Sequence, residues 1–134
     1  DEDTFMKGPI GKATKFPKLS SFDAQTICLL QPYQDRLHSK DAVAARVNKY
    51  LSAKKYLSDE GHFAFVLIGD EEIEIASFKR SQKLDILGKH EVSNSLAEIL
   101  PKGFTPLNCA GGESAVFVRT YLRERNYLVL GDLN

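Results

Sequence analysis

Residues 62–78 read HFAFVLI-GDEE-IEIASF, and this stretch decides the fold that we predict. Two runs rich in β-branched and aromatic residues flank Gly69-Asp70-Glu71-Glu72, and a Gly-Asp turn between such runs indicates a β-hairpin. The first run is almost wholly apolar, which is typical of a strand at the centre of a sheet. The second run alternates, with Glu72, Glu74 and Ala76 on one face and Ile73 and Ile75 on the other.

The clearest helical pattern lies before this hairpin. Ser39 is suited to cap the helix and Asp41 to its first turn, while Lys54 and Lys55 suit its end, where the helix dipole favours positive charge. The apolar face recurs at helical spacing and consists of Val43, Val47, Tyr50, Leu51 and Leu57.

Two further helices are predicted after the hairpin. Ser93–Leu100 is stopped by Pro101 and Gly103, and a longer helix, Glu113–Asn126, follows the Gly111-Gly112 turn. Short apolar runs predict the other strands, namely Gln25–Leu30, Phe104–Leu107 and Tyr127–Leu130.

These elements predict an α+β domain with a mostly antiparallel sheet, a central β-hairpin and two or three packing helices. The length of 134 residues suits one domain. We expect residues 1–20, with their glycines, prolines and lysines, to form an extended or irregular arm, followed by the single domain at 21–134. Because the chain opens with Asp1, we expect a processed protein or an excised domain.

The composition argues against several functions. The formal net charge is zero, so there is no basic field to attract nucleic acid or an anionic membrane. No apolar run approaches the ~20 residues that a membrane span needs. Phosphate-binding and dinucleotide motifs are absent, and we expect no cofactor and no metal. With Cys28 and Cys109 as the two cysteines, we expect reduced thiols in a cytoplasm, either the cell's own or that of a host.

The segment from Asn108 to Val118 carries the residues best suited to chemistry. Ser114 would stand at the start of the predicted helix, where unpaired N–H groups and the helix dipole stabilise an anionic nucleophile and a developing oxyanion. Gly111 and Gly112 permit a sharp turn before it, and the Asn108 amide could act as a further oxyanion donor.

This segment resembles the nucleophile motif of a clan of cysteine proteases and acyltransferases. The clan unites the ubiquitin-like-protein proteases, the adenovirus-type proteases and the YopJ-type acetyltransferase effectors, and its chain order is His, acid, Cys. The protease motif reads roughly Gln-x-x-Gly-x-Asp-Cys-Gly, and its five defined positions fall on Asn108, Gly111, Glu113, Ser114 and Ala115. Upstream, the run that opens at His62 looks like the clan's strand that begins with the catalytic His.

The resemblance implies an acyl-transfer site with His62 as the base, Glu74 as its orienting acid, Ser114 at the nucleophile position and Asn108 as an oxyanion donor. The implied substrate is a peptide or isopeptide bond of a ubiquitin-like protein, or a host protein to be acetylated. Two departures stand out. Serine is a weaker nucleophile than a thiolate, and the clan's acid aligns near Ala76, so that Glu74 or the less well placed Glu72 must serve.

An engineered Cys→Ser change, a decayed pseudoenzyme and chance similarity all fit these departures, and we expect little or no turnover. Each residue also has a structural interpretation. His62 can open a strand at the surface, Ser114 can cap a helix, and Glu72 and Glu74 can protect an edge strand from aggregation.

Two other functions compete with acyl transfer. A zinc deaminase is suggested by His90-Glu91 and by Pro106–Cys109, but only one cysteine is in range of such a site. The stronger alternative is a non-catalytic protein-binding module of a larger or secreted protein. Acyl transfer requires the His62 ring and the Ser114 hydroxyl to lie within hydrogen-bond reach, so their separation decides between the two hypotheses.

Overall fold

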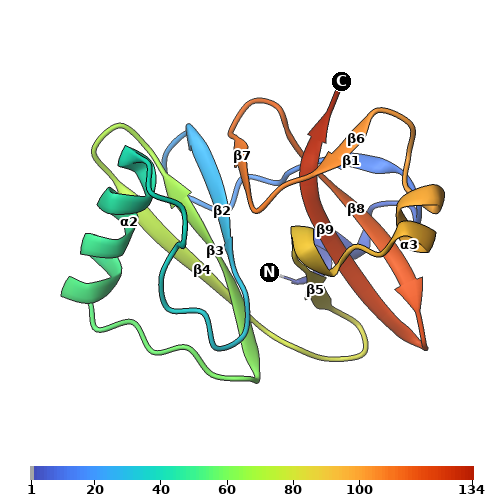
Figure 1. Cartoon of the computed structure of the whole chain (residues 1–134), viewed down its shortest axis with the longest axis horizontal. Coiled ribbons are helices and arrows are strands. Elements are labelled where there is room, and N and C mark those ends of the chain that lie inside the picture. Colours follow the sequence, from blue (N-terminus) through green and yellow to red (C-terminus); the bar gives the residue numbers. More distant parts are fainter. Residues whose placement is uncertain (1) are drawn as a thin grey trace.

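Two β-sheets pack face to face in the computed structural model, which describes residues 2–134 (Figure 1). Sheet B is antiparallel with the order β4-β3-β2-β7, and its strands are β2 (Thr26–Leu30), β3 (His62–Ile68), β4 (Ile73–Lys79) and β7 (Cys109–Gly111). Sheet A has the order β1-β8-β9-β5, with β6 also paired to β9, and only its β5–β9 pair is parallel. Its strands are β1 (Ala13–Lys15), β5 (Asp85–Leu87), β6 (Phe104–Pro106), β8 (Ala115–Leu122) and β9 (Arg125–Leu133).

Two of the helices cover the outer faces of the two sheets (Figure 1). The helices are α1 (Glu2–Met6), α2 (Ala42–Ala53) and α3 (Asn94–Ile99), and η1 (Lys89–Glu91) is a short 3₁₀ helix. In Figure 1, α2 lies on the outer side of sheet B and α3 on the outer side of sheet A. The molecule is therefore layered as helix, sheet, sheet, helix.

Strand β3 shows why its sequence is apolar throughout. Phe63, Phe65 and Leu67 point into the core between the sheets, and the alternate residues Ala64, Val66 and Ile68 pack beneath α2. Both faces of the strand are thus buried, as expected for the centre of a three-layered region. The core between the sheets is rich in aromatic rings, namely Phe5, Phe16, Phe63, Phe65, Phe78 and Phe117.

The α+β class and the central hairpin predicted from the sequence are confirmed. β3 and β4 pair over their full length, and β3 has a partner on each side. On β4, Ile73 and Ile75 pack towards α2, whereas Ala76 and Phe78 face the other sheet. The alternation of residues along β4 therefore arises because one face of the strand packs towards α2 and the other faces sheet A.

The helix predicted before the hairpin is present with different limits. Asp41 rather than Ser39 caps it, since the Asp41 Oδ1 accepts from the Ala44 N–H at 2.8 Å. The helix ends at Ala53, and Leu57, predicted on its buried face, is 89% exposed. The short helix α3 is capped by Ser93 and agrees with the prediction.

The helix predicted over Glu113–Asn126 is wrong, because residues 115–133 form the β8–β9 hairpin. Ala115 and Phe117, two residues apart, both point into the core between the sheets, and this two-residue repeat is that of a strand. The turn is Arg123-Glu124, and both residues adopt positive φ (52° and 61°), as the tight two-residue turns of hairpins require. Neither residue is Asn or Gly, so the usual signal for such a turn is missing from the sequence.

The first twenty residues, predicted as an extended or irregular arm, contain α1 and β1 in the part that the structure describes. The Phe5 ring is fully buried against Phe16, Phe65, Phe78 and Phe117. This segment therefore belongs to the core of the domain.

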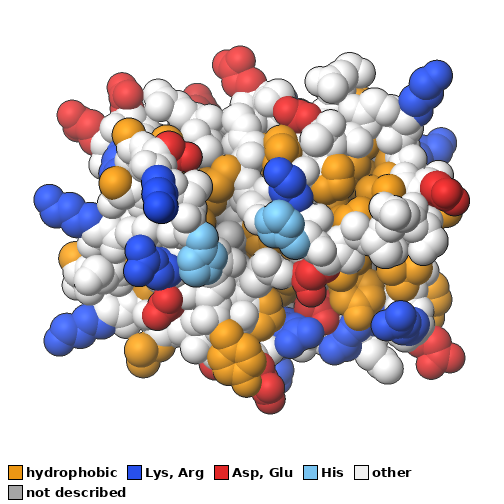
Figure 2. All heavy atoms as spheres, in the orientation of Figure 1, with side chains coloured by type: hydrophobic (Ala, Val, Ile, Leu, Met, Phe, Trp, Pro, Cys, Tyr) orange, Lys and Arg blue, Asp and Glu red, His pale blue; other side chains and the backbone are white. Residues whose placement is uncertain are grey.

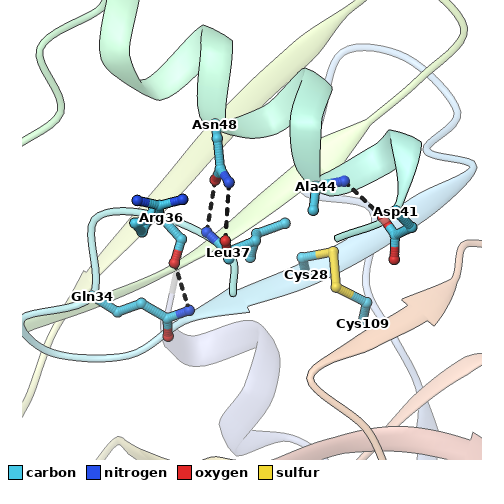
Figure 3. The surroundings of a disulfide bond; sticks show 8 residues. All are labelled: Cys28, Gln34, Arg36, Leu37, Asp41, Ala44, Asn48 and Cys109. Carbon is cyan, nitrogen blue, oxygen red and sulfur yellow. Dashed lines mark hydrogen bonds between the residues drawn. A yellow bond between two sulfur atoms is a disulfide. The ribbon is translucent and has the colours of Figure 1, made fainter. Parts of the chain in front are cut away.

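The expectation of two reduced thiols is also wrong, because Cys28 and Cys109 form a disulfide (Figure 3). The two residues face each other across the antiparallel β2–β7 pair, with Cα atoms 4.0 Å apart. The bond lies beneath α2, beside a loop that is held by two hydrogen bonds between the Asn48 side chain and the backbone of Leu37. The pairing depends on strand β7, which the sequence did not predict.

Candidate functional site: a groove at one end of the sandwich

His62 and Ser114 lie at opposite ends of sheet B. His62 opens β3, whose other end, Ile68, pairs with Thr26, and Thr26 pairs in turn with Gly111. Ser114 follows Gly111 closely in the chain. Because a strand rises about 3.3 Å per residue, the length of β3 puts roughly 20 Å between the two positions. The structure therefore does not bring the expected base to the expected nucleophile.

His62 and Glu74 are not paired with each other: the partner of His62 is Asp59, and that of Glu74 is Ser21. His62 Nδ1 lies 2.9 Å from Asp59 Oδ1, and this hydrogen bond holds the pKa of Asp59 below its ordinary value. Glu74, expected to orient His62, instead accepts from the N–H of Ser21 at 2.9 Å and from its hydroxyl at 3.0 Å. Glu74 thus fixes the chain segment before β2.

Asn108 and Ser114 are likewise bound elsewhere. Asn108 Oδ1 accepts from the Lys89 N–H at 2.9 Å, so this side chain anchors η1. The Ser114 hydroxyl donates to the carbonyl of Gly111 at 3.4 Å. Ser114 precedes a strand instead of beginning a helix, so the helix-terminal N–H groups that would have stabilised an oxyanion are not there.

Ser114 instead stands at the rim of a groove of about 1290 Å³. The floor is apolar and includes Ile27 and Leu67 of sheet B, which are only 4% and 1% exposed. The rim is polar and carries both signs of charge, with Lys15, Lys18, Asp23 and Glu113. Lys18 and Asp23 form an exposed ion pair at 3.4 Å.

Two chain crossings between the sheets build this groove. Residues 16–25 carry the chain from β1 to β2, and residues 112–114 carry it from β7 to β8. The crossings touch where the Gly112 N–H donates to the Gln25 carbonyl at 2.8 Å. A Cβ on Gly112 would lie 1.6 Å from the carbonyl oxygen of Ala24, so this contact requires glycine.

The opposite end of the sandwich is closed by a buried ionic bridge between the sheets. Asp85, which is 0% exposed, accepts from Arg80 Nε at 2.8 Å and from Arg125 Nε at 3.1 Å. Arg80 directly follows β4 of sheet B, whereas Asp85 and Arg125 belong to sheet A. The hydrogen bond with Asp85 raises the pKa of Arg80, so this guanidinium stays charged.

A strained tyrosine lies close to this closed end. Tyr33 has a φ of 67°, which is unusual for a bulky residue. Its N–H donates to the Asp59 carbonyl at 3.2 Å, and its hydroxyl donates to Glu60 at 2.8 Å. The bond to Glu60 raises the pKa of Tyr33. These contacts join the loop after β2 to the loop before β3.

The structure also bears on the zinc and membrane alternatives. Over residues 2–134, no group of three or more His, Cys, Asp or Glu side chains is arranged to hold a metal ion. Cys109 is in the disulfide, so it cannot serve as the zinc ligand that a deaminase would need. Among the same residues, no helix combines the length and the apolar character needed to cross a membrane.

Comparison with known proteins adds no relative: no family model, no curated protein and no solved structure matches the chain. The resemblance to the His-acid-Cys clan therefore remains a prediction from residues 61–126.

The groove itself was not predicted from the sequence. Half of one wall, residues 16–20 of 16–25, falls in the segment assigned to an arm, and the other wall falls at the start of the helix that proved to be a strand. The one available signal was the Gly111-Gly112 pair, which correctly indicated a sharp turn.

Proposed function

We propose that the chain is a non-catalytic binding module whose groove receives a segment of a protein partner. The observation that carries this proposal is the groove of about 1290 Å³ with Ile27 and Leu67 at its floor. Sites for small ligands usually measure about 300–1,000 Å³, so this groove suits an elongated ligand better than a metabolite.

The distribution of polarity in the groove supports a polypeptide ligand. An apolar centre within a polar rim is the arrangement of protein interfaces. The rim offers two lysines and two acidic residues, so it matches a chain that carries side chains of both signs. Ser114, at the rim, acts in this proposal as a contact residue for the partner.

A displayed library of random linear peptides tests the proposal. Peptides recovered on the wild-type protein are measured by fluorescence anisotropy against Ser114→Tyr, which places a bulky ring at the groove rim. We expect binding to weaken roughly tenfold or more. Ser52→Tyr, at an exposed position of α2 away from the groove, is the matched control and should bind as the wild type does. Failure to recover peptides, or equal binding by Ser114→Tyr, would contradict the proposal.

The same variant position tests the acyl-transfer hypothesis directly. Ser114→Cys is treated with a ubiquitin probe that carries a thiol-reactive C-terminus, and we expect no labelling because His62 lies roughly 20 Å away along β3. Labelling that disappears in the double variant Ser114→Cys/His62→Ala would overturn the non-catalytic proposal.

A further inference from the structure

Strand β4 leaves one edge of sheet B open. β4 is the last strand of the order β4-β3-β2-β7, and Figure 1 shows it beyond β3 at that margin of the sheet. The hydrogen bonds Gly69 N–H to Glu72 O and Arg80 N–H to Gly61 O, both 2.8 Å, bracket the β3–β4 ladder. They show that the even-numbered residues of β4 bond to β3, because bonded pairs alternate along an antiparallel ladder.

The odd-numbered residues of β4 therefore direct their N–H and C=O groups away from the sheet. These residues are Ile73, Ile75, Ser77 and Lys79, and no hydrogen bond between described residues uses their backbone groups. Ser77 and Lys79 are exposed, and the two isoleucines are half-buried. A regular seven-residue edge with free backbone groups is a ready template for another strand.

The charges at the two ends of β4 select the partner. Asp70, Glu71 and Glu72 precede the strand, whereas Lys79 lies at its other end, and the neighbouring Arg80 is already paired with Asp85. A second copy in antiparallel orientation places the acidic end of each strand against the basic end of the other. A parallel copy would place like charges together. The exposed side chains of Glu71 and Lys79 take part in no ion pair among residues 2–134, so both are available.

We propose that β4 pairs with β4 of a second copy of this chain, about a two-fold axis at Ile75. In this register Ile75 faces its own copy, Ile73 faces Ser77, and Glu71 faces Lys79 on both sides of the axis. Within the two strands only outward-facing residues oppose one another, so the free backbone groups of Ile73, Ile75 and Ser77 gain partners, and the side chain of Glu71, in the turn before β4, comes next to that of Lys79. The two sheets B join into one continuous sheet, with both α2 helices on the same face. Such an interface is self-complementary, as closed two-fold dimers require.

The oligomeric state, measured by sedimentation equilibrium over a range of protein concentrations, tests this proposal. We expect a monomer–dimer equilibrium in the wild type. Glu71→Lys and Lys79→Glu should each weaken the dimer roughly tenfold, because each change places like charges opposite each other twice per dimer. The combined variant Glu71→Lys/Lys79→Glu restores opposite charges and should recover most of the affinity.

Control variants separate this interface from a general effect of charge. Glu98→Lys and Lys102→Glu make the same changes at exposed positions in and after α3 and should leave dimerisation unchanged. Ser77→Pro removes an outward N–H without breaking a bond to β3, and it should abolish the dimer while circular dichroism confirms the fold.

Three outcomes would overturn the proposal. The first is a protein that stays monomeric at every concentration, which would leave the β4 edge to an extended segment of a different protein. The second is a dimer whose affinity is unchanged by both single charge reversals. The third is a combined variant whose dimer is no tighter than that of either single variant. Binding of the recovered groove peptides should not change in any of these variants, so failure of this proposal is distinct from failure of the proposed function.

Discussion

The two ends of the sandwich join the same two sheets in different ways. At the closed end, near His62, residues 80–84 carry the chain from β4 to β5, and the buried bridge of Asp85 with Arg80 and Arg125 fills the space beside this crossing. At the groove end, near Ser114, the main chain itself crosses between the sheets and leaves a space of about 1290 Å³ between the crossings. One end is filled and the other is hollow.

This difference separates His62 and Ser114, which the sequence analysis had assigned to one site. His62 and its partner Asp59 belong to the closed end, whereas Ser114 borders the hollow end. A hollow with a buried apolar floor can accept a ligand, but it offers no imidazole to assist chemistry on that ligand. The visible face in Figure 2 shows acidic and basic side chains intermixed around its margins, in keeping with a formal net charge of zero.

The largest effect is expected from the disulfide, which ties β7 and so the groove end to the centre of sheet B. The bond closes a separation of 81 residues, and such a cross-link stabilises mainly by restricting the unfolded chain. Cys28→Ala/Cys109→Ala should lower the free energy of unfolding, measured by urea denaturation, by about 4 kcal/mol. The native oxidised wild type should show no free thiol with a chromogenic thiol reagent; two reactive thiols would contradict the pairing.

The next largest effect tests the closed end. Asp85→Asn leaves two partly buried guanidinium groups without their carboxylate, and we expect the free energy of unfolding to fall by about 3 kcal/mol. Asp23→Asn is the matched change at the groove end, where the ion pair with Lys18 is exposed, and it should leave the free energy of unfolding nearly unchanged. Equal losses in urea denaturation would show that the two ends do not differ as described.

The smallest effect concerns the turn of the β8–β9 hairpin, which also lies at the closed end. Arg123 and Glu124 both hold positive φ, a conformation that costs most residues about 1 kcal/mol. Arg123→Asn/Glu124→Gly should therefore raise the free energy of unfolding by about 1 kcal/mol and raise the melting temperature. Lys83→Gly, at a residue without positive φ, should not stabilise. A loss of stability in the turn variant would mean that these side chains support the hairpin in another way.

Secondary structure was predicted correctly where the local pattern of the sequence agreed with the final packing. The run from His62 to Ile68 is apolar because it is buried on both faces, and both its strand form and its central position were predicted. The pattern over Glu113–Asn126 failed because its apolar residues fit a helical face as well as a strand, and the turn at Arg123-Glu124 gave no signal.

The candidate site was harder to predict than the fold. Ser114, predicted as a nucleophile at a helix start, lies at the rim of the groove, and the roles assigned to His62, Glu74 and Asn108 depended on distances that no local pattern contains. The disulfide was missed for the same reason. Its cysteines are 81 residues apart and meet only because β7 adds to the edge of β2.

By itself, the sequence determined the α+β class, the central hairpin and two helices, because alternation, apolar runs and capping residues act between neighbours in the chain. Only the tertiary structure decided that Cys28 bonds to Cys109, that Asp85 bridges the sheets, and that Ser114 and His62 lie at opposite ends. These facts depend on strand register and on which sheet each strand joins. A shift of one residue in the register of a strand would rearrange every such contact without altering the local pattern of the sequence.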